Sequence, residues 1–427
     1  MGKVDALWKG YPHGGYYILA TRLAKSMLWA GLPRRYSIVN ARLTPTIGSG
    51  LSLANELHTT LPLPSKLRQI DGLQVLRAVA VLLVAWLHAG QWLWSLSSSH
   101  LPGFGVYGID LFFVISGFIV SSIVLRTKQA PGPRAMWEFL KRRLIRIFPI
   151  YWLFALLEVA RFLLAHRTGL RNYIPIFFLL PGLGYPEIPL LVDFSWTMVF
   201  EMFFYYSLAA VLLATVRRAV PVSIAFFCLA IVVGRFVGIQ RPVWIIVCNP
   251  ILLEFVFGAI VALAYSRFGR RRYLGIAMFG LGVAASFCLT AFPSVAATGL
   301  QMVLADAKVV ARTMTWGLAA VLVVGGTVFW SPSVQRFPGR VAVVLGNASY
   351  SAYLASSLVI EFTMRLLIKV WGGRVPLSAG RVASYQTIGA VAVFAVGWLC
   401  YQFIEWPMLR WLQRKLLTPV SDGKTRI

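Results

Sequence analysis

Long apolar runs separated by short polar stretches fill most of the sequence from about residue 68 onward. A helix needs about 20 predominantly apolar residues to cross the hydrocarbon core of a membrane, and ten of these runs are long enough. We therefore expect an all-α integral membrane protein, built as a bundle of about ten transmembrane helices. The expected spans are residues 72–92, 108–126, 147–165, 196–216, 220–239, 243–265, 273–292, 311–330, 342–369 and 386–404.

The composition agrees with this expectation and excludes an ordinary soluble domain. Of the 427 residues, 58% are hydrophobic and only 13% are charged, which is too little charge to cover a soluble surface. The four cysteines lie inside apolar runs and lack the spacing of a metal site, so we expect packing residues and no bound metal. They are Cys228, Cys248, Cys288 and Cys400.

The placement of lysine and arginine indicates how the helices are oriented. The net charge is +27, and membrane proteins concentrate basic residues in their cytoplasmic loops. With ten spans and a cytoplasmic N-terminus, the inner segments carry 29 of the 41 lysine and arginine residues, whereas the first outer loop, 93–107, carries none. We therefore expect both termini in the cytoplasm, and a charge excess that reports orientation and not nucleic-acid binding.

Three further segments complete the expected organisation. The run 172–184 is short and broken by two prolines and a glycine, and counting it as a span would move the basic stretches RRAV and SRFGRRRY outside, so we expect it not to span. Residues 1–65 lack the layout of a signal peptide and are expected to form a poorly ordered or membrane-surface extension. Residues 412–427 are expected to form a cytoplasmic tail.

Arg77 and His88 are ionisable residues inside the first expected span, IDGLQVLRAVAVLLVAWLHAG. They are eleven residues apart, which is about three helical turns, so both side chains leave the helix on the same side. The rise between them is about 16 Å, which places Arg77 toward the cytoplasm and His88 in the outer half. Ionisable residues within a span mark a functional site unless they form structural ion pairs.

Two carboxylates are expected near the depth of His88. Asp110 lies at the outer end of the second span, where it could orient an imidazole or act as an acidic residue favoured by a helix N-terminus. Glu201 lies about a turn and a half inside the fourth span and shares a face with Tyr205. Two other buried acids, Glu254 and Glu361, fit structural ion pairs, with Arg235 as a partner for Glu254.

The basic stretch KRRLIRIFPIYW begins the third span at its cytoplasmic end. Much of its charge is an orientation signal. Its guanidinium groups could also hold the phosphates of an anionic cytosolic ligand, because guanidinium pairs well with phosphate. The basic residues in question are Lys141, Arg142, Arg143 and Arg146.

Seven motifs together resemble the membrane acyltransferase-3 family. They are LQVLRAVAVLLVAWLHA, GIDLFFVISGFIV, RRLIRIFPIYW, SWTMVFEMFFY, NPILLEFVFG, LGNASYSAYL and FIEWPMLRW, and they follow in family order from about residue 68 to 411. The pattern is most similar to members that acylate bacterial exopolysaccharides. The resemblance implies an acyltransferase transmembrane domain over residues 66–411 that moves an acyl group, usually acetyl from acetyl-CoA, to a carbohydrate hydroxyl.

The resemblance also assigns roles to single positions. Arg77 and His88 match the family's essential pair, and other recurrent polar positions fall on Asp110, Glu201, Arg142, Arg143 and Arg146. The chain departs from the pattern in two places. Residues 1–65 have no counterpart, and Ser356 stands where the family often has a second histidine.

These observations lead to one mechanistic hypothesis. Acyl-CoA, a donor substrate and not a permanently bound cofactor, docks its phosphates on Arg77 and the 142–146 cluster. His88 acts as general base on a sugar hydroxyl, or carries the acyl group briefly, and Glu201 or Asp110 orients it. Exopolysaccharide, O-antigen and other glycans remain open as acceptors. We expect the protein itself to lie in the lipid of a bacterial inner membrane. The alternatives are a proton-coupled exporter of a lipid-linked sugar or polysaccharide and an inert scaffold.

Overall fold

A computed structural model describes residues 70–93, 104–164, 177–180, 195–237, 242–290, 308–334, 336–371 and 377–417. Residues 1–65, the tail beyond residue 417 and most of 172–184 lie outside this part of the chain, so the expectations for them stay predictions. The chain divides into two compact units, and one of them comprises residues 1–69 and 160–168. The described helices lie in the other unit, apart from residues 160–164 at the end of α5 (Pro133–Leu164).

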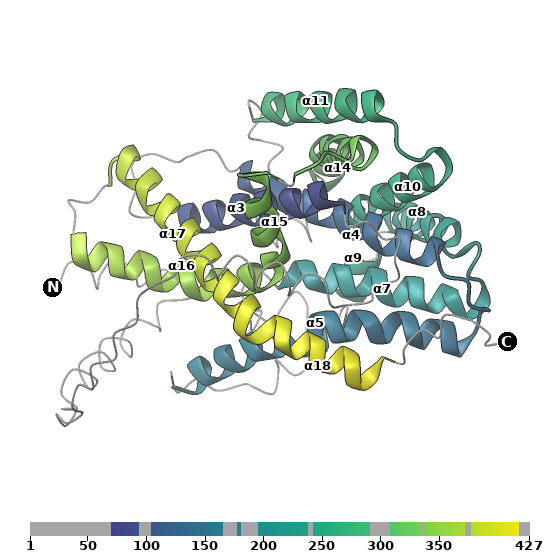
Figure 1. Cartoon of the computed structure of the whole chain (residues 1–427), viewed down its shortest axis with the longest axis horizontal. Helices are drawn as coiled ribbons and strands as arrows, with labels where there is room; N and C mark the ends of the chain where they lie inside the picture. Colours follow the sequence, from purple (N-terminus) through teal and green to yellow (C-terminus); the bar gives the residue numbers. More distant parts are fainter. Residues whose placement is uncertain are drawn as a thin grey trace, which may run out of the picture. The chain divides into compact units, whose positions relative to one another are not determined.

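The described residues form helices joined by turns (Figure 1). The longer helices are α3 (Asp71–Leu93), α4 (Tyr107–Leu125), α5 (Pro133–Leu164), α7 (Trp196–Ala214), α8 (Ala219–Val237), α10 (Leu253–Phe268), α11 (Arg272–Leu289), α14 (Leu318–Trp330), α16 (Ser349–Trp371) and α17 (Ala379–Cys400). The shorter ones are α9 (Pro242–Val247), α13 (Lys308–Arg312), α15 (Gly339–Asn347) and α18 (Trp406–Leu416).

Within the described ranges, nine helical segments are long and apolar enough to cross a membrane. They correspond to nine of the ten expected spans, and the all-helical class is confirmed. The tenth expected span, 147–165, falls in α5 and ends beyond the described residues; α5 is not among the nine candidates. The orientation of the termini stays a prediction.

Helices α3 and α4 pack antiparallel near the middle of the bundle, and glycines bring them together. A Cβ added at Gly105 would meet the backbone of Leu83, and one added at Gly108 would meet that of Ala80. As the chain advances from Gly105 to Gly108, its partner on α3 moves back from Leu83 to Ala80, so α4 starts beside the middle of α3 and runs toward the Arg77 end. Eight residues after Gly108, or about 12 Å along α4, Ser116 therefore lies toward the Arg77 end.

Other helices surround this pair. Helix α10 packs on α4, where Gly117 contacts the backbone of Phe255, and small residues of this kind allow close helix packing in membranes. Helices α15, α16 and α17 cover another side of α3, and α11 lies at the edge against α14 (Figure 1). Most residues of α3 are buried, whereas α11 exposes most of its side chains. His88 of α3 is buried, and the Arg77 side chain extends toward Arg146 of α5, so both point into protein.

Two π-helical turns interrupt this regular packing. The first, η7 (Thr313–Gly317), joins α13 to α14, and the second, η8 (Tyr401–Glu405), joins α17 to α18. Single π-helical turns inside longer helices occur frequently at functional sites, because they redirect side chains. Each turn here lies beside a fully buried carboxylate: Gly317 approaches Glu254, and Glu405 ends η8.

Candidate active site

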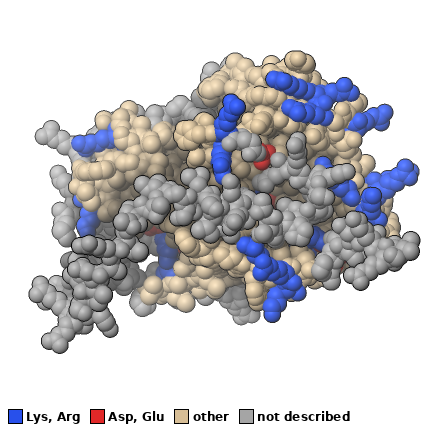
Figure 2. Space-filling model, viewed as in Figure 1, with Lys and Arg blue, Asp and Glu red and all other residues tan. Residues whose placement is uncertain are grey.

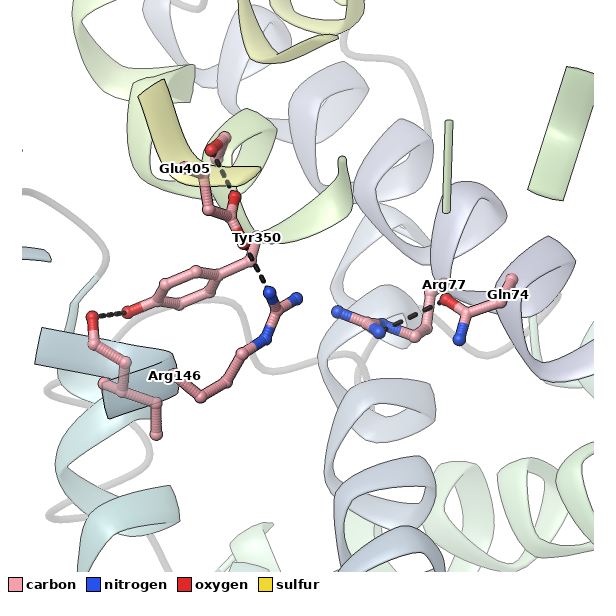
Figure 3. Close-up of polar contacts among 7 residues, drawn as sticks. Gln74, Arg77, Arg146, Tyr350 and Glu405 are labelled. Atoms are coloured by element: carbon pink, nitrogen blue, oxygen red, sulfur yellow. Dashed lines mark hydrogen bonds and ion pairs between the residues drawn. The ribbon is translucent and has the colours of Figure 1, made fainter. Parts of the chain in front are cut away.

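Arg77 lies one turn after Gln74 on α3, and the two side chains are hydrogen-bonded. Arg77 Nη1 donates to Gln74 Oε1 over 3.2 Å. The guanidinium also interacts electrostatically with Arg146, Glu405 and Glu201, which come from three other helical segments. The amide of Gln74 thus fixes the direction in which Arg77 points. Figure 3 shows the Arg77 guanidinium extending away from α3 toward that of Arg146.

Arg146 reaches the same space from α5. Its Nη1 donates to Glu405 Oε1 over 2.6 Å, and its guanidinium lies 5.9 Å from the centre of the Tyr350 ring. Glu405 is fully buried, whereas Arg146 keeps 31% of its side-chain surface exposed. The two guanidinium groups of Arg77 and Arg146 therefore face one another with one side of Arg146 still open (Figure 3).

Glu201 joins this cationic group from α7. It accepts short hydrogen bonds from Tyr205 on its own helix and from Ser116 on α4. Its charged neighbours are Arg77 and Arg143. The Nε atom of Arg143 is buried without a hydrogen-bond partner, so this guanidinium keeps a donor in the protein interior. We call Arg77, Arg143, Arg146, Glu201 and Glu405 the arginine cluster.

Arg142 belongs to the protein surface. It lies 3.8 Å from Glu138, one turn earlier on α5, and exposes 39% of its side chain. Lys141 contacts the same carboxylate over 3.3 Å. Of the four arginines predicted to hold a donor, the structure thus brings Arg77, Arg143 and Arg146 together and directs Arg142 toward Glu138.

His88 is buried near the other end of α3. Its Nδ1 is 2.8 Å from Gln91 Oε1, and an amide oxygen only accepts, so this bond places the hydrogen of neutral imidazole on Nδ1. The proton-accepting lone pair is then on Nε2. Gln386 of α17 donates to the carbonyl of Trp86 over 3.0 Å and so ties α17 to this end of α3.

The carboxylates expected to orient His88 are found elsewhere. Asp110 Oδ2 accepts from Arg312 Nη2 over 2.8 Å, and its Oδ1 accepts no hydrogen bond. Glu201 lies in the arginine cluster and not at the depth of His88, because it accepts a hydrogen bond from Ser116, which lies toward the Arg77 end of α3. Neither carboxylate hydrogen-bonds to His88. The residue seen in the orienting position is Gln91.

Asp110 and Arg312 form an ion pair with both side chains 1% exposed. Glu254 of α10 lies beside this pair and is also fully buried. The expected partner of Glu254, Arg235, is exposed on α8, so that pairing is wrong. Glu361 is only partly buried and contacts Arg365 over 2.5 Å, one turn later on α16, as expected of a structural pair.

Arg312, Glu405, Gln91 and Tyr350 are residues that the sequence did not single out. An arginine at the start of an apolar run was the available signal for Arg312, and the acid in FIEWPMLRW was the signal for Glu405. At the position where the family often has a second histidine, Ser356 is buried and donates to the carbonyl of Tyr353 over 2.6 Å.

The fold and site define a multi-pass membrane protein in which one helix, α3, carries both Arg77 of the arginine cluster and the buried His88. Residues 70–402 match the family model described as an acyltransferase domain, so the chain belongs to the acyltransferase-3 family. Together with the relatives described next, this membership makes the protein an O-acyltransferase.

Two relatives illustrate the similarity. The exopolysaccharide production protein ExoZ of Rhizobium meliloti (strain 1021) is 30% identical over 336 residues, which are 75% of this chain and 94% of that protein. The O-acetyltransferase OatA of Staphylococcus aureus (strain NCTC 8325 / PS 47) is 35% identical over 103 residues, only 24% of this chain and 16% of that protein. A comparison with solved structures found no match.

Proposed function

We propose that this protein transfers an acyl group, most simply acetyl from acetyl-CoA, across the membrane to a hydroxyl of a surface or secreted carbohydrate. The observation that carries the proposal is the arrangement along α3, with the arginine cluster around Arg77 and a buried histidine eleven residues further on. The similarity to an exopolysaccharide production protein and to an O-acetyltransferase supports a carbohydrate acceptor and an acetyl donor.

The arginine cluster suits the phosphates of a CoA thioester. Three guanidinium groups face two carboxylates, so the cluster carries an excess of positive charge inside the protein. An anionic ligand would compensate that charge, and guanidinium forks bind phosphate oxygens through paired hydrogen bonds. The exposed side of Arg146 and the unused donor of Arg143 are available for such bonds.

His88 is then the general base. The distance along α3 from Arg77 to His88, about 16 Å, is what the pantetheine arm has to cover to bring the thioester to the imidazole. Nε2 takes the proton of the sugar hydroxyl while the hydroxyl oxygen attacks the thioester carbonyl. The carbon–sulfur bond breaks, and the CoA thiolate leaves with the proton that His88 returns. The products are the O-acylated sugar and CoA thiol.

The proposed topology places the donor site at the cytoplasm and the acceptor at the outer side of a bacterial inner membrane, with both termini inside. The basic stretch between the end of α10 and the start of α11 supports it, because cytoplasmic loops are rich in basic residues, and Figure 2 shows several lysine and arginine side chains near this part of the molecule. The arginines there are Arg267, Arg270, Arg271 and Arg272.

Inverted membrane vesicles test the proposal because they expose the cytoplasmic face. Vesicles that contain the protein should incorporate label from radiolabelled acetyl-CoA into carbohydrate, and vesicles without it should not. Movement of a lipid-linked sugar without consumption of acetyl-CoA would contradict the proposal and favour an exporter.

A further inference from the structure

Glu405 is a fully buried carboxylate at an irregular point of the chain. It is the last residue of the π-helical turn η8, between α17 and α18, and lies 259 residues after its partner Arg146. Burying a carboxylate costs free energy unless charged or polar partners satisfy it. The contacts of Glu405 therefore indicate its role.

Both oxygens of Glu405 are occupied. Arg146 donates to Oε1 over 2.6 Å, and the Ser351 hydroxyl donates to Oε2 over 2.5 Å. Each oxygen of this carboxylate already accepts a hydrogen bond from the protein, and the side chain is closed off from solvent, so it is not placed to take a proton from a substrate. It is therefore suited to act through Arg146 and not on the reacting atoms (Figure 3).

The neighbour of Ser351 holds Arg146 from another side. The ring of Tyr350 lies under the Arg146 guanidinium, 5.9 Å from its centre. The Tyr350 hydroxyl donates to the carbonyl of Ile147 over 3.0 Å, so the same ring is tied to the backbone beside Arg146. Consecutive residues of α16 thus support both the arginine and its counter-ion.

Electrostatics explains why such support is needed. Arg77 and Arg146 repel one another, and Glu405 attracts both. If the charge of Glu405 were removed, the two cations would separate and Arg146 would turn toward its open side. Preorganising a binding site in this way strengthens binding because less order has to be created when the ligand arrives.

We propose that Glu405 is a positioning residue that holds Arg146 against Arg77 in the geometry that receives the anionic part of the acyl donor. This inference rests on the proposed function and adds to it the residue that organises the donor site. It also explains the π-helical turn, which directs the Glu405 side chain into the arginine cluster.

The test uses the full-length protein with Glu405→Gln, which keeps the shape of the side chain and removes its charge. Acetyl-CoA binding is measured by calorimetry on detergent-purified protein, and transfer is measured in membrane vesicles. We expect affinity for acetyl-CoA to fall about tenfold, since a charge-assisted bond is lost, while the rate at saturating acetyl-CoA stays within about twofold of wild type. Ser351→Ala should weaken binding in the same direction by about threefold.

Two controls distinguish positioning from a general structural effect. Glu361→Gln removes another carboxylate that contacts an arginine, at a partly exposed position of α16, and should leave acetyl-CoA binding unchanged. In an Arg146→Gln background, Glu405→Gln should have no further effect on affinity, because its influence passes through Arg146.

The outcomes separate this inference from the proposed function. If wild type transfers acetyl groups and Glu405→Gln binds acetyl-CoA normally, or loses maximal rate without losing affinity, the positioning role is wrong and the function stands. If wild type shows no transfer from acetyl-CoA, the proposed function fails whatever Glu405 does. Should Glu405→Gln not fold, normal acetyl-CoA affinity of Ser351→Ala would overturn the inference.

Discussion

Replacement of His88 by alanine is expected to lower acyl transfer by about 10²- to 10⁴-fold, the contribution of a general base. The imidazole is buried, and its Nδ1 is held by Gln91, so alanine removes the proton acceptor without touching the arginine cluster. The measurement is transfer of label from acetyl-CoA in membrane vesicles. Acetyl-CoA affinity should stay close to wild type, because the donor phosphates are proposed to bind at the other end of α3.

The control for this experiment is Gln91→Ala, which keeps the imidazole and removes the partner of Nδ1. It should reduce transfer by much less, because the histidine can still accept a proton once it is correctly turned. The assigned role of His88 would be refuted if His88→Ala, at the same amount of folded protein, transferred acyl groups at the wild-type rate.

Replacement of Arg312 by alanine is expected to destabilise the protein by about 3–5 kcal/mol, the cost of breaking a buried ion pair from one side. Asp110 would lose the hydrogen bond from Arg312 while remaining buried next to a second carboxylate, Glu254. Thermal unfolding of the detergent-purified protein measures this effect. Asp110→Ala should have a similar effect from the other side of the pair.

Arg142→Ala is the matched control for stability. Its contact with Glu138 is long and exposed, so its loss should cost no more than about 1 kcal/mol. An Asp110→Asn protein that unfolds at the wild-type temperature but has lost acyl transfer would contradict the structural role of this pair. It would restore the catalytic role predicted from the sequence.

The sequence predicted the helices well because membrane spans are a local property. A run of about 20 apolar residues predicts a span whatever helices pack against it. Nine of the expected spans have counterparts among the described helices. That Arg77 and His88 lie on the same side of their helix could be predicted for the same reason, since it follows from the period of one helix.

The contacts between helices could not be predicted from local sequence. The pairs Arg146–Glu405 and Arg312–Asp110 join residues 259 and 202 positions apart, and no pattern in one sequence fixes which distant helices touch. Glu201 shows the consequence. Its distance from the end of its own span suggested the depth of His88, whereas the antiparallel packing of α3 and α4 brings its partner Ser116 to the level of Arg77.

The role of Gln74 could not be predicted from its polarity alone. In the sequence it is one more polar residue in an apolar run, one turn before Arg77. In the structure it accepts a hydrogen bond from Arg77 and so helps to direct the guanidinium toward Arg146. The role of Gln74 can be assigned only once the direction of the Arg77 side chain is known.

The proposed function is the placement of an acyl group on a carbohydrate at the cell surface. Mass spectrometry of surface and secreted glycans tests it most directly, with cells that lack the protein, cells complemented with wild type and cells complemented with His88→Ala. Wild type should add the mass of one acyl unit, acetyl in the simplest case, to one glycan, and the other two strains should lack it. Identical glycan masses in all three strains would refute the proposed function.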